Sequence, residues 1–285
     1  MVHNINGLDH TLIGVSDLEQ ARESYEKIGF TLTPRGSHIG WGTANYCIMF
    51  EEDYIELLGI VDPKLETNGL DVVLKERGEG MLGLALSSDN PDATYQSLKE
   101  NGLDPQEPAD LKRKLELPEG DVIPEFKLVR LPVEGLSGKG LFICHHLTPE
   151  LIRKPEWLEH ANGASYVKSV VTLVENPEAL REYYCKLCGV LNVTFTDATL
   201  TVRIGRLNLI FVAERDLDLL FPGLTFAEDW PELPHLFATT IAVKDIRKTA
   251  EYLESRGLQV QKIASGALRL KLSDTNGALM EFVPE

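Results

Sequence analysis

Apolar and polar positions along the chain form one pattern that occurs four times. Each repeat opens with an apolar strand and a polar turn, continues with a short amphipathic helix that ends at glycine, and closes with further alternating strands. In the first repeat the opening strand covers residues 8–15, and Ser16 and Asp17 precede a helix over residues 18–28 that ends at Gly29. Strands are then predicted over residues 30–34, 45–50 and 53–58.

The spacing of the helices indicates modules of about seventy residues, too long for an ordinary solenoid repeat. Equivalent helix positions carry Ala21, Ala93, Ala179 and Ala250, at intervals of 72, 86 and 71 residues. The longer central interval contains Pro149, Pro155 and the turn-prone pair Asn162-Gly163, which indicates a linker. We therefore predict an α+β protein of four βαβββ modules in two pairs, with an N-terminal domain over residues 1–160 and a C-terminal domain over residues 161–285.

Composition and charge narrow the class of protein. Of the 285 residues 43% are hydrophobic and 25% charged, as in soluble globular proteins. The formal net charge of −16, from 28 Lys and Arg against 44 Asp and Glu, argues against nucleic acid or anionic lipid as a partner. No apolar run is long enough to span a membrane, and the first residues do not resemble a signal peptide. We expect a cytoplasmic protein that binds a small-molecule substrate, and the sequence leaves a homodimer open.

Several motifs with established chemistry are absent. The four cysteines are too few and scattered for a disulfide framework, and Cys185 and Cys188 form a C-x-x-C pair without a second pair or nearby histidine to complete a zinc site. We expect these two to be helix-face thiols. The chain has no glycine-rich phosphate loop and no G-x-S-x-G sequence, which disfavours nucleotide-dependent and serine-hydrolase activities.

The paired βαβββ modules resemble the vicinal oxygen chelate superfamily, which includes glyoxalase I, extradiol dioxygenases and bleomycin-resistance proteins. Leu8-Asp9-His10 opens the first module and Tyr54-Ile55-Glu56-Leu57 closes it. The nearest likeness is to the glyoxalase-like domain branch. The resemblance implies that each pair of modules folds into a cup-shaped domain, a pseudo-barrel, and that a divalent metal ion lies inside one cup.

Carried over by position, the resemblance implies metal ligands on the first and last strands of the modules. His10 and Glu56 match this pattern in module one. In module two the position equivalent to His10 is expected near Met81 or Leu82, neither of which can bind such an ion. The resemblance therefore leaves the last strand of module two as the source of the remaining ligand.

That last strand ends in Cys144-His145-His146. The period-two alternation of a strand puts His146 on the same face as Cys144, so His146 is the predicted ligand and His145 the reserve. The triad would be His10, Glu56 and His146. Two imidazoles and one carboxylate leave coordination positions for water or substrate, and suit Zn, Fe, Mn, Ni or Co. The alternative is that each is a polar residue at the end of a strand.

No comparable set exists in the C-terminal pair of modules. Lys168 or its neighbours and Ala238 take the place of His10, and Leu209 or Ile210 takes the place of Glu56. Only Glu281 matches. We expect a metal-free C-terminal domain.

Two segments supply candidate substrate-binding residues. The loop of residues 36–45 is rich in small residues and carries His38, Thr43 and Asn45, although it also suits an ordinary hairpin. The linker carries three further candidates that would cover the mouth of the cup as a lid, unless it is only a connection: Trp157, His160 and Asn162.

The leading hypothesis is a glyoxalase-type lyase or isomerase in which a metal ion binds two vicinal oxygens of a small substrate. Glu56, or His38 as a second candidate, would transfer the proton. A second carboxylate ligand and a site for glutathione are missing from the pattern, which argues against glutathione as a cosubstrate. The alternatives are an Fe(II) extradiol-type dioxygenase and a metal-free binding or resistance protein.

Overall fold

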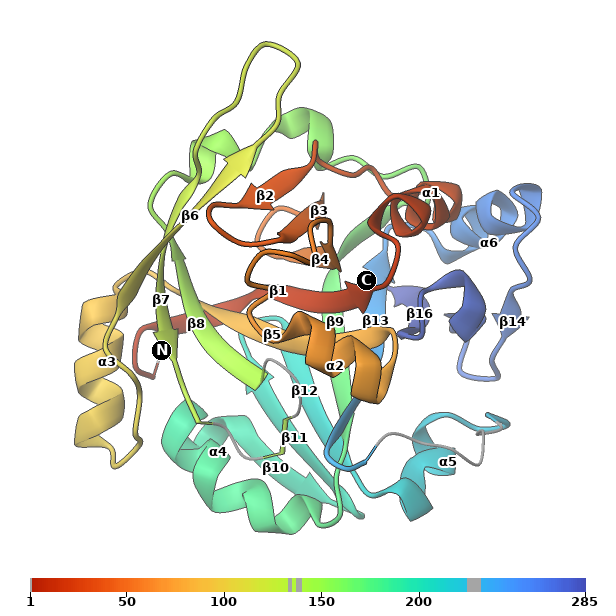
Figure 1. Ribbon diagram of the computed structural model, residues 1–285. Coiled ribbons are helices and arrows are strands. Elements are labelled where there is room, and N and C mark those ends of the chain that lie inside the picture. The colour runs from red at the N-terminus through yellow and green to blue at the C-terminus, as the bar shows by residue number, and fades with distance from the viewer. Residues whose placement is uncertain (1, 133–134, 137–139, 225–231) are drawn as a thin grey trace.

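Two eight-stranded sheets organise the computed structural model, which describes residues 2–132, 135–136, 140–224 and 232–285. The order of its elements repeats four βαβββ modules, so the predicted fold class is confirmed. In Figure 1 the first pair of modules runs from red to yellow-green, and the second pair from green to blue.

The first sheet contains modules one and two. Module one consists of β1 (Ile5–Val15), α1 (Leu18–Ile28), β2 (Gly36–His38), β3 (Thr43–Met49) and β4 (Tyr54–Ile60). After α2 (Leu70–Arg77), module two consists of β5 (Gly80–Ser88), α3 (Pro91–Glu100), β6 (Ala109–Leu115), β7 (Glu125–Arg130) and β8 (Gly140–His146). Two single 3₁₀ turns follow, at Pro149–Leu151 and Pro155–Trp157.

The second sheet contains modules three and four. Module three consists of β9 (Ala164–Leu173), a 3₁₀ turn (Pro177–Leu180), α4 (Arg181–Cys188), a 3₁₀ turn (Val190–Asn192), β10 (Val193–Thr196), β11 (Thr199–Ile204) and β12 (Leu207–Val212). A 3₁₀ turn (Glu214–Asp216) and α5 (Leu217–Leu220) lead to module four, which consists of β13 (His235–Val243), α6 (Ile246–Ser255), β14 (Gln261–Lys262), β15 (Leu268–Arg269), a 3₁₀ turn (Leu272–Asp274) and β16 (Leu279–Pro284).

Both sheets share one strand order, but only the first closes. Its order is β1-β4-β3-β2-β6-β7-β8-β5, with β1 and β4 parallel and β1 and β5 antiparallel. Antiparallel pairing of β2 with β6 completes a barrel. The second sheet runs β10-β11-β12-β9-β13-β16-β15-β14 and stays open at β10 and β14. The enclosed space that a ligand requires therefore lies in the first pair of modules.

Capping residues fix the ends of α1 where the sequence predicts them. The Asp17 side chain accepts a hydrogen bond from the Gln20 N–H, and Gly29 adopts a left-handed conformation with φ 99°. The buried face of α1 packs against the main core and consists of Leu18, Ala21, Tyr25 and Ile28. The helix is thus locked to the barrel wall on one face.

The strand predicted over residues 30–34 is wrong. Backbone groups there are bonded outside a strand ladder: the Thr31 N–H donates to His160, and the Thr33 N–H donates to the Cys47 carbonyl. Pro34 has no N–H to offer to a ladder. The second strand of module one is instead the short β2, three residues long.

The described part of the chain contains no helix with both the length and the apolar character needed to cross a membrane. Cys47, Cys144, Cys185 and Cys188 are all free thiols, and the last two lie on α4 as expected for helix-face cysteines.

Candidate metal and substrate site

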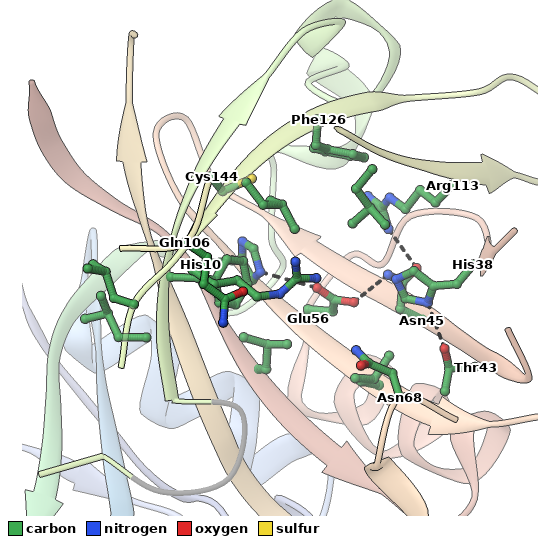
Figure 2. A pocket seen from close by; sticks show the side chains of 18 of the residues that line it. His10, His38, Thr43, Asn45, Glu56, Asn68, Gln106, Arg113, Phe126 and Cys144 are labelled. Atoms are coloured by element: carbon green, nitrogen blue, oxygen red, sulfur yellow. Dashed lines mark hydrogen bonds and ion pairs between the residues drawn. The ribbon is translucent and has the colours of Figure 1, made fainter. Parts of the chain in front are cut away.

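A cavity of about 620 Å³ lies inside the N-terminal barrel (Figure 2). Its walls come from both modules and combine aromatic and aliphatic side chains with a few polar groups. The aromatic side chains are Trp41, Tyr54, Phe126 and Phe142. The polar groups discussed below are His10, His38, Thr43, Asn45, Glu56 and Arg113.

His10 and Glu56 meet at the wall of this cavity. They lie on the adjacent parallel strands β1 and β4, with His10 Nε2 3.5 Å from Glu56 Oε2. The residues are only 4% and 6% exposed, respectively. The ring of Tyr54 stacks on the His10 imidazole at 4.5 Å between centroids and fixes its plane.

Asp9 joins His10 to His146. Asp9 Oδ1 lies 2.6 Å from His10 Nδ1, and Asp9 Oδ2 lies 2.9 Å from His146 Nε2. The pairing of β1 with β5 is irregular between Leu8 and His10, so Asp9 belongs to a bulge and can turn inward beside its neighbour. Burial would raise the pKa of Asp9, but the two imidazoles outweigh it and hold the pKa well below its usual range.

Cys144 and His146 form a second group around the carboxylate of Asp9. Ligand atoms of Asp9, Cys144 and His146 all lie within 4.8 Å of one another. The Nδ1 atom of His146 is buried and has no hydrogen-bond partner among the described residues. Burial and the nearby carboxylates raise the pKa of the Cys144 thiol well above its ordinary value, so the metal-free site contains a protonated thiol.

The second carboxylate oxygen of Glu56 is bound by the amide of Asn45, which is in turn bound by the guanidinium of Arg113. The Asn45 Nδ2 group donates a 2.6 Å hydrogen bond to Glu56 Oε1, and Arg113 Nη1 donates a 2.7 Å hydrogen bond to Asn45 Oδ1 (Figure 2). Burial raises the pKa of Glu56, but His10, Arg113 and His38 together lower it below its ordinary value. Glu56 is therefore a fixed, ionised carboxylate at the cavity wall.

The chain belongs by sequence to a known family. A family model described as a glyoxalase-like domain matches residues 8–188, more than half of the chain. This protein is a member of the glyoxalase-like domain family. No match was found among curated proteins.

Solved structures share the fold at low sequence identity. A hypothetical protein from Staphylococcus aureus is 13% identical with a TM-score of 0.68, over 98% of this chain and 99% of that one. A triple mutant of 4-hydroxymandelate synthase from Streptomyces coelicolor is 10% identical with a TM-score of 0.63, over 98% of this chain and 92% of that one. A xylose isomerase-like TIM barrel/4-hydroxyphenylpyruvate dioxygenase fusion protein is 11% identical with a TM-score of 0.58, over 98% of this chain and 48% of that one. These likenesses show that the chain shares its fold with these proteins over almost its whole length.

The three predicted metal ligands of this glyoxalase-like protein stand in two places. His10 and Glu56 face each other at the cavity, whereas His146 is not one of the lining residues and is joined to His10 through Asp9. His146 shares the inner face of β8 with Cys144, as the alternation predicted, and His145 instead bonds to the Ser88 carbonyl. The module-two position opposite His10 is Ala85 rather than Met81 or Leu82, since β1 pairs His10 with Ala85.

The residues predicted from the loop of residues 36–45 all reach the cavity. Thr43 Oγ1 lies 3.0 Å from His38 Nδ1, and the Trp41 ring lies 5.4 Å from the His38 ring between centroids. Asn45 contacts Glu56 directly. This hairpin therefore places a histidine, a hydroxyl and an amide along one side of the candidate site.

The three residues predicted for a lid lie outside the cavity lining. His160 accepts a hydrogen bond from the Thr31 N–H and contacts the Met49 carbonyl, and Asn162 donates to the Ile28 carbonyl. Trp157 is buried in a hydrophobic cluster that also contains the cavity-lining residues Tyr54 and Phe126. Burial lowers the pKa of His160 to about 4, which keeps its imidazole neutral. His160 and Asn162 are thus docked at the end of α1 and the turn after it, and a lid role for the linker stays a prediction.

Sequence reasoning missed Asp9 and Arg113. Asp9 stands next to His10 in the sequence, but regular alternation would point it to the opposite face. Arg113 carried a usable signal, because Leu111, Arg113 and Leu115 alternate with charged neighbours along β6 and so face inward together.

The described part of the C-terminal sheet offers no similar set. Its concave face is filled by apolar side chains from the sheet and from α5, including Leu217, Phe221 and Phe237. Glu281 is paired with Arg269 at 2.7 Å. Among the described residues of this sheet no three metal-type donors come together.

Proposed function

We propose that this protein is a divalent-metal-dependent enzyme of glyoxalase type, a lyase or isomerase that binds two neighbouring oxygens of a small substrate in the N-terminal cavity. The contact that carries the proposal is that of His10 Nε2 with Glu56 Oε2, 3.5 Å apart and nearly buried at the cavity wall. Two donor atoms at this separation can bind one ion, whose bonds to nitrogen and oxygen are each about 2 Å long.

The donor set suits a metal ion. Histidines that bind metals commonly donate the other ring N–H to a carboxylate, and Asp9 stands in that position for both His10 and His146. This assignment leaves His10 Nε2 as a bare nitrogen donor beside Glu56, and His146 Nδ1 as a bare nitrogen donor without a partner among the described residues. We assign the ion to His10 and Glu56, with His146, which Asp9 joins to His10, as the third predicted ligand. Cys144 is in reach of Asp9 and His146 as a further donor.

A bound divalent ion would supply Lewis-acid stabilisation of negative charge on a substrate oxygen. The protein's part is to hold and move the proton. Glu56 faces the cavity and, if it is released from the ion, can accept a proton from the substrate; His38, steadied by Thr43, is the second candidate base. The chain from Arg113 through Asn45 keeps Glu56 oriented.

Elemental analysis of protein purified under nitrogen, without added metal or chelator, tests the proposal. We expect near-stoichiometric zinc, nickel, cobalt or manganese in the wild type, and its loss in a His10→Ala, Glu56→Ala variant. The adjacent histidines of β8 give a matched pair: His146→Ala should lower metal content and His145→Ala should not. Wild-type protein that neither carries nor takes up metal would favour a metal-free binding or resistance protein.

An Fe(II)-dependent dioxygenase is the second candidate. Two histidines and one carboxylate are the donor set of many non-haem iron oxygenases, and two of the structures that share this fold are named as a dioxygenase fusion protein and 4-hydroxymandelate synthase. Stoichiometric iron in the anaerobically purified protein, with oxygen consumption that requires His10 and Glu56, would decide for this candidate over a lyase or isomerase.

A further inference from the structure

Arg113 places a positive charge inside the cavity and has no carboxylate of a described residue in ion-pair contact, although it interacts electrostatically with Glu56 beyond Asn45. It lies on β6 and is 4% exposed. Its Nη1 group donates to Asn45 Oδ1 and to Cys47 Sγ, at 2.7 Å and 3.4 Å. No carboxylate of a described residue forms an ion pair with it, and Nε and Nη2 form no hydrogen bond to any described residue. A buried guanidinium in this state is costly unless something else supplies the negative charge.

The geometry around Arg113 suits a ligand with a negatively charged group. Arg113 lines the cavity, is buried, and keeps Nε and Nη2 without a partner among the described residues. A carboxylate in the cavity could accept hydrogen bonds from these two groups. A guanidinium is suited to a carboxylate because its planar N–H groups can donate to both oxygens at once.

The cavity walls near Arg113 indicate what the rest of this ligand is. The guanidinium lies over the Phe126 ring at 5.5 Å, and Leu111 and Leu128 from β6 and β7 face the same space. Phe142 continues this apolar surface toward His10, whose ring it contacts edge-on. The body of the ligand is therefore apolar or aromatic.

We propose that the cavity takes a small monocarboxylate with an apolar body, and that Arg113 binds its carboxylate. This inference deepens the proposed function, since it assigns the substrate class of the same cavity. Arg113 is then a specificity-determining residue as well as a support for Asn45 and Glu56. If Arg113 only supported Asn45 and Glu56, replacing it would weaken the binding of acids and of their neutral amides equally. The ratio of the affinity for an acid to that for its amide therefore separates the two roles.

Fluorine NMR titration with 4-fluorophenylacetate and 4-fluorophenylacetamide tests the inference. We expect wild-type protein to bind the acid about 10-fold more tightly than the amide or better, as charge-assisted hydrogen bonds predict. Arg113→Met should bring the ratio near one, and Arg113→Lys should retain part of it. The control is Arg130→Met, which removes an exposed arginine at the same cavity and should change the ratio less than about 3-fold.

Titrations of chelator-treated and zinc-reconstituted protein separate this inference from the metal proposal. A preference for the acid that survives chelation and depends on Arg113 supports it. Equal affinities in wild type, or no binding of the acid at millimolar concentration, would overturn it whatever the metal content. A preference that survives in Arg113→Met but vanishes on chelation would place the carboxylate on the metal, and would overturn the inference while leaving the metal proposal intact. Circular dichroism confirms that each variant is folded.

Discussion

Asp9 contacts two imidazoles with one carboxylate, so replacing one of its oxygens should disturb at least one of the two histidines that it positions. Asp9→Asn keeps the shape but replaces one acceptor oxygen, facing His10 or His146, with an N–H donor. We expect metal affinity to fall about 10- to 100-fold, the usual effect of losing such a partner. Competition with a chromogenic chelator measures this. Asp53→Asn, which changes a buried aspartate elsewhere, should leave the affinity unchanged, and an Asp9→Asn protein with wild-type affinity would refute the positioning role.

The individual site residues differ in how far the sequence could predict them. His10, Glu56 and the inward face of His146 followed from strand alternation and the resemblance. Asp9 could not be predicted, because a bulge in β1 turns it to the face that alternation assigns to its neighbours. The hydrogen bond between Arg113 and Asn45 could not be predicted either. These residues are 68 positions apart in the sequence, and they meet only because β2 pairs with β6 where the barrel closes.

Helices and strands were predicted best where neighbouring residues cap their ends. They were predicted worst where a distant segment forms hydrogen bonds with their backbone groups. The limits of α1 follow from Asp17 and Gly29. Residues 30–34 fail as a strand because the linker around His160 takes the hydrogen bond of Thr31. The same docking explains why His160 and Asn162 are bound to α1 and its following turn.

Two helix-ending glycines provide a test at the scale of elements. Gly29 and Gly102 both have left-handed φ angles, so alanine at either position should cost about 1 kcal/mol of stability. At Gly102 a Cβ atom would meet no atom within 4 Å, whereas at Gly29 it would come 2.4 Å from Tyr252 on α6 and 3.1 Å from Asn162. We expect Gly29→Ala to cost a further 1 to 3 kcal/mol or so, by urea denaturation. Equal costs would mean that α6 and the linker do not pack on α1 as described.

On the scale of the whole molecule, the two sheets share one strand order but differ in what fills them. The first closes and keeps a cavity, and the second stays open with its concave face packed by apolar side chains. The repetition in the sequence predicted that both pairs consist of βαβββ modules, but not the order of the strands. The difference could not be predicted, because closure depends on whether short edge strands such as β2 and β14 find partners.

Asp53 couples the two sheets and should make their association depend on pH. Its carboxyl group accepts a hydrogen bond from the Val167 N–H of β9, and burial raises its pKa to about 8, against the opposing effects of that hydrogen bond and of Arg153. Unfolding would return the pKa to about 3.8. Between these values the native state keeps a proton that the unfolded state releases. This contribution to stability is therefore complete below pH 4 and is lost as the pH rises through 8.

Replacing Asp53 with asparagine should remove this dependence, because the amide oxygen can still accept from Val167 but carries no titratable proton. From pH 5 to pH 8, the unfolding free energy of Asp53→Asn should rise relative to wild type by about 2 to 4 kcal/mol, given roughly 1.4 kcal/mol per pH unit for one proton. Urea denaturation at several pH values, with chelator present, measures the difference. The exposed Asp89→Asn variant is the control and should follow wild type throughout. A constant difference between Asp53→Asn and wild type would show that Asp53 is ionised in the native protein.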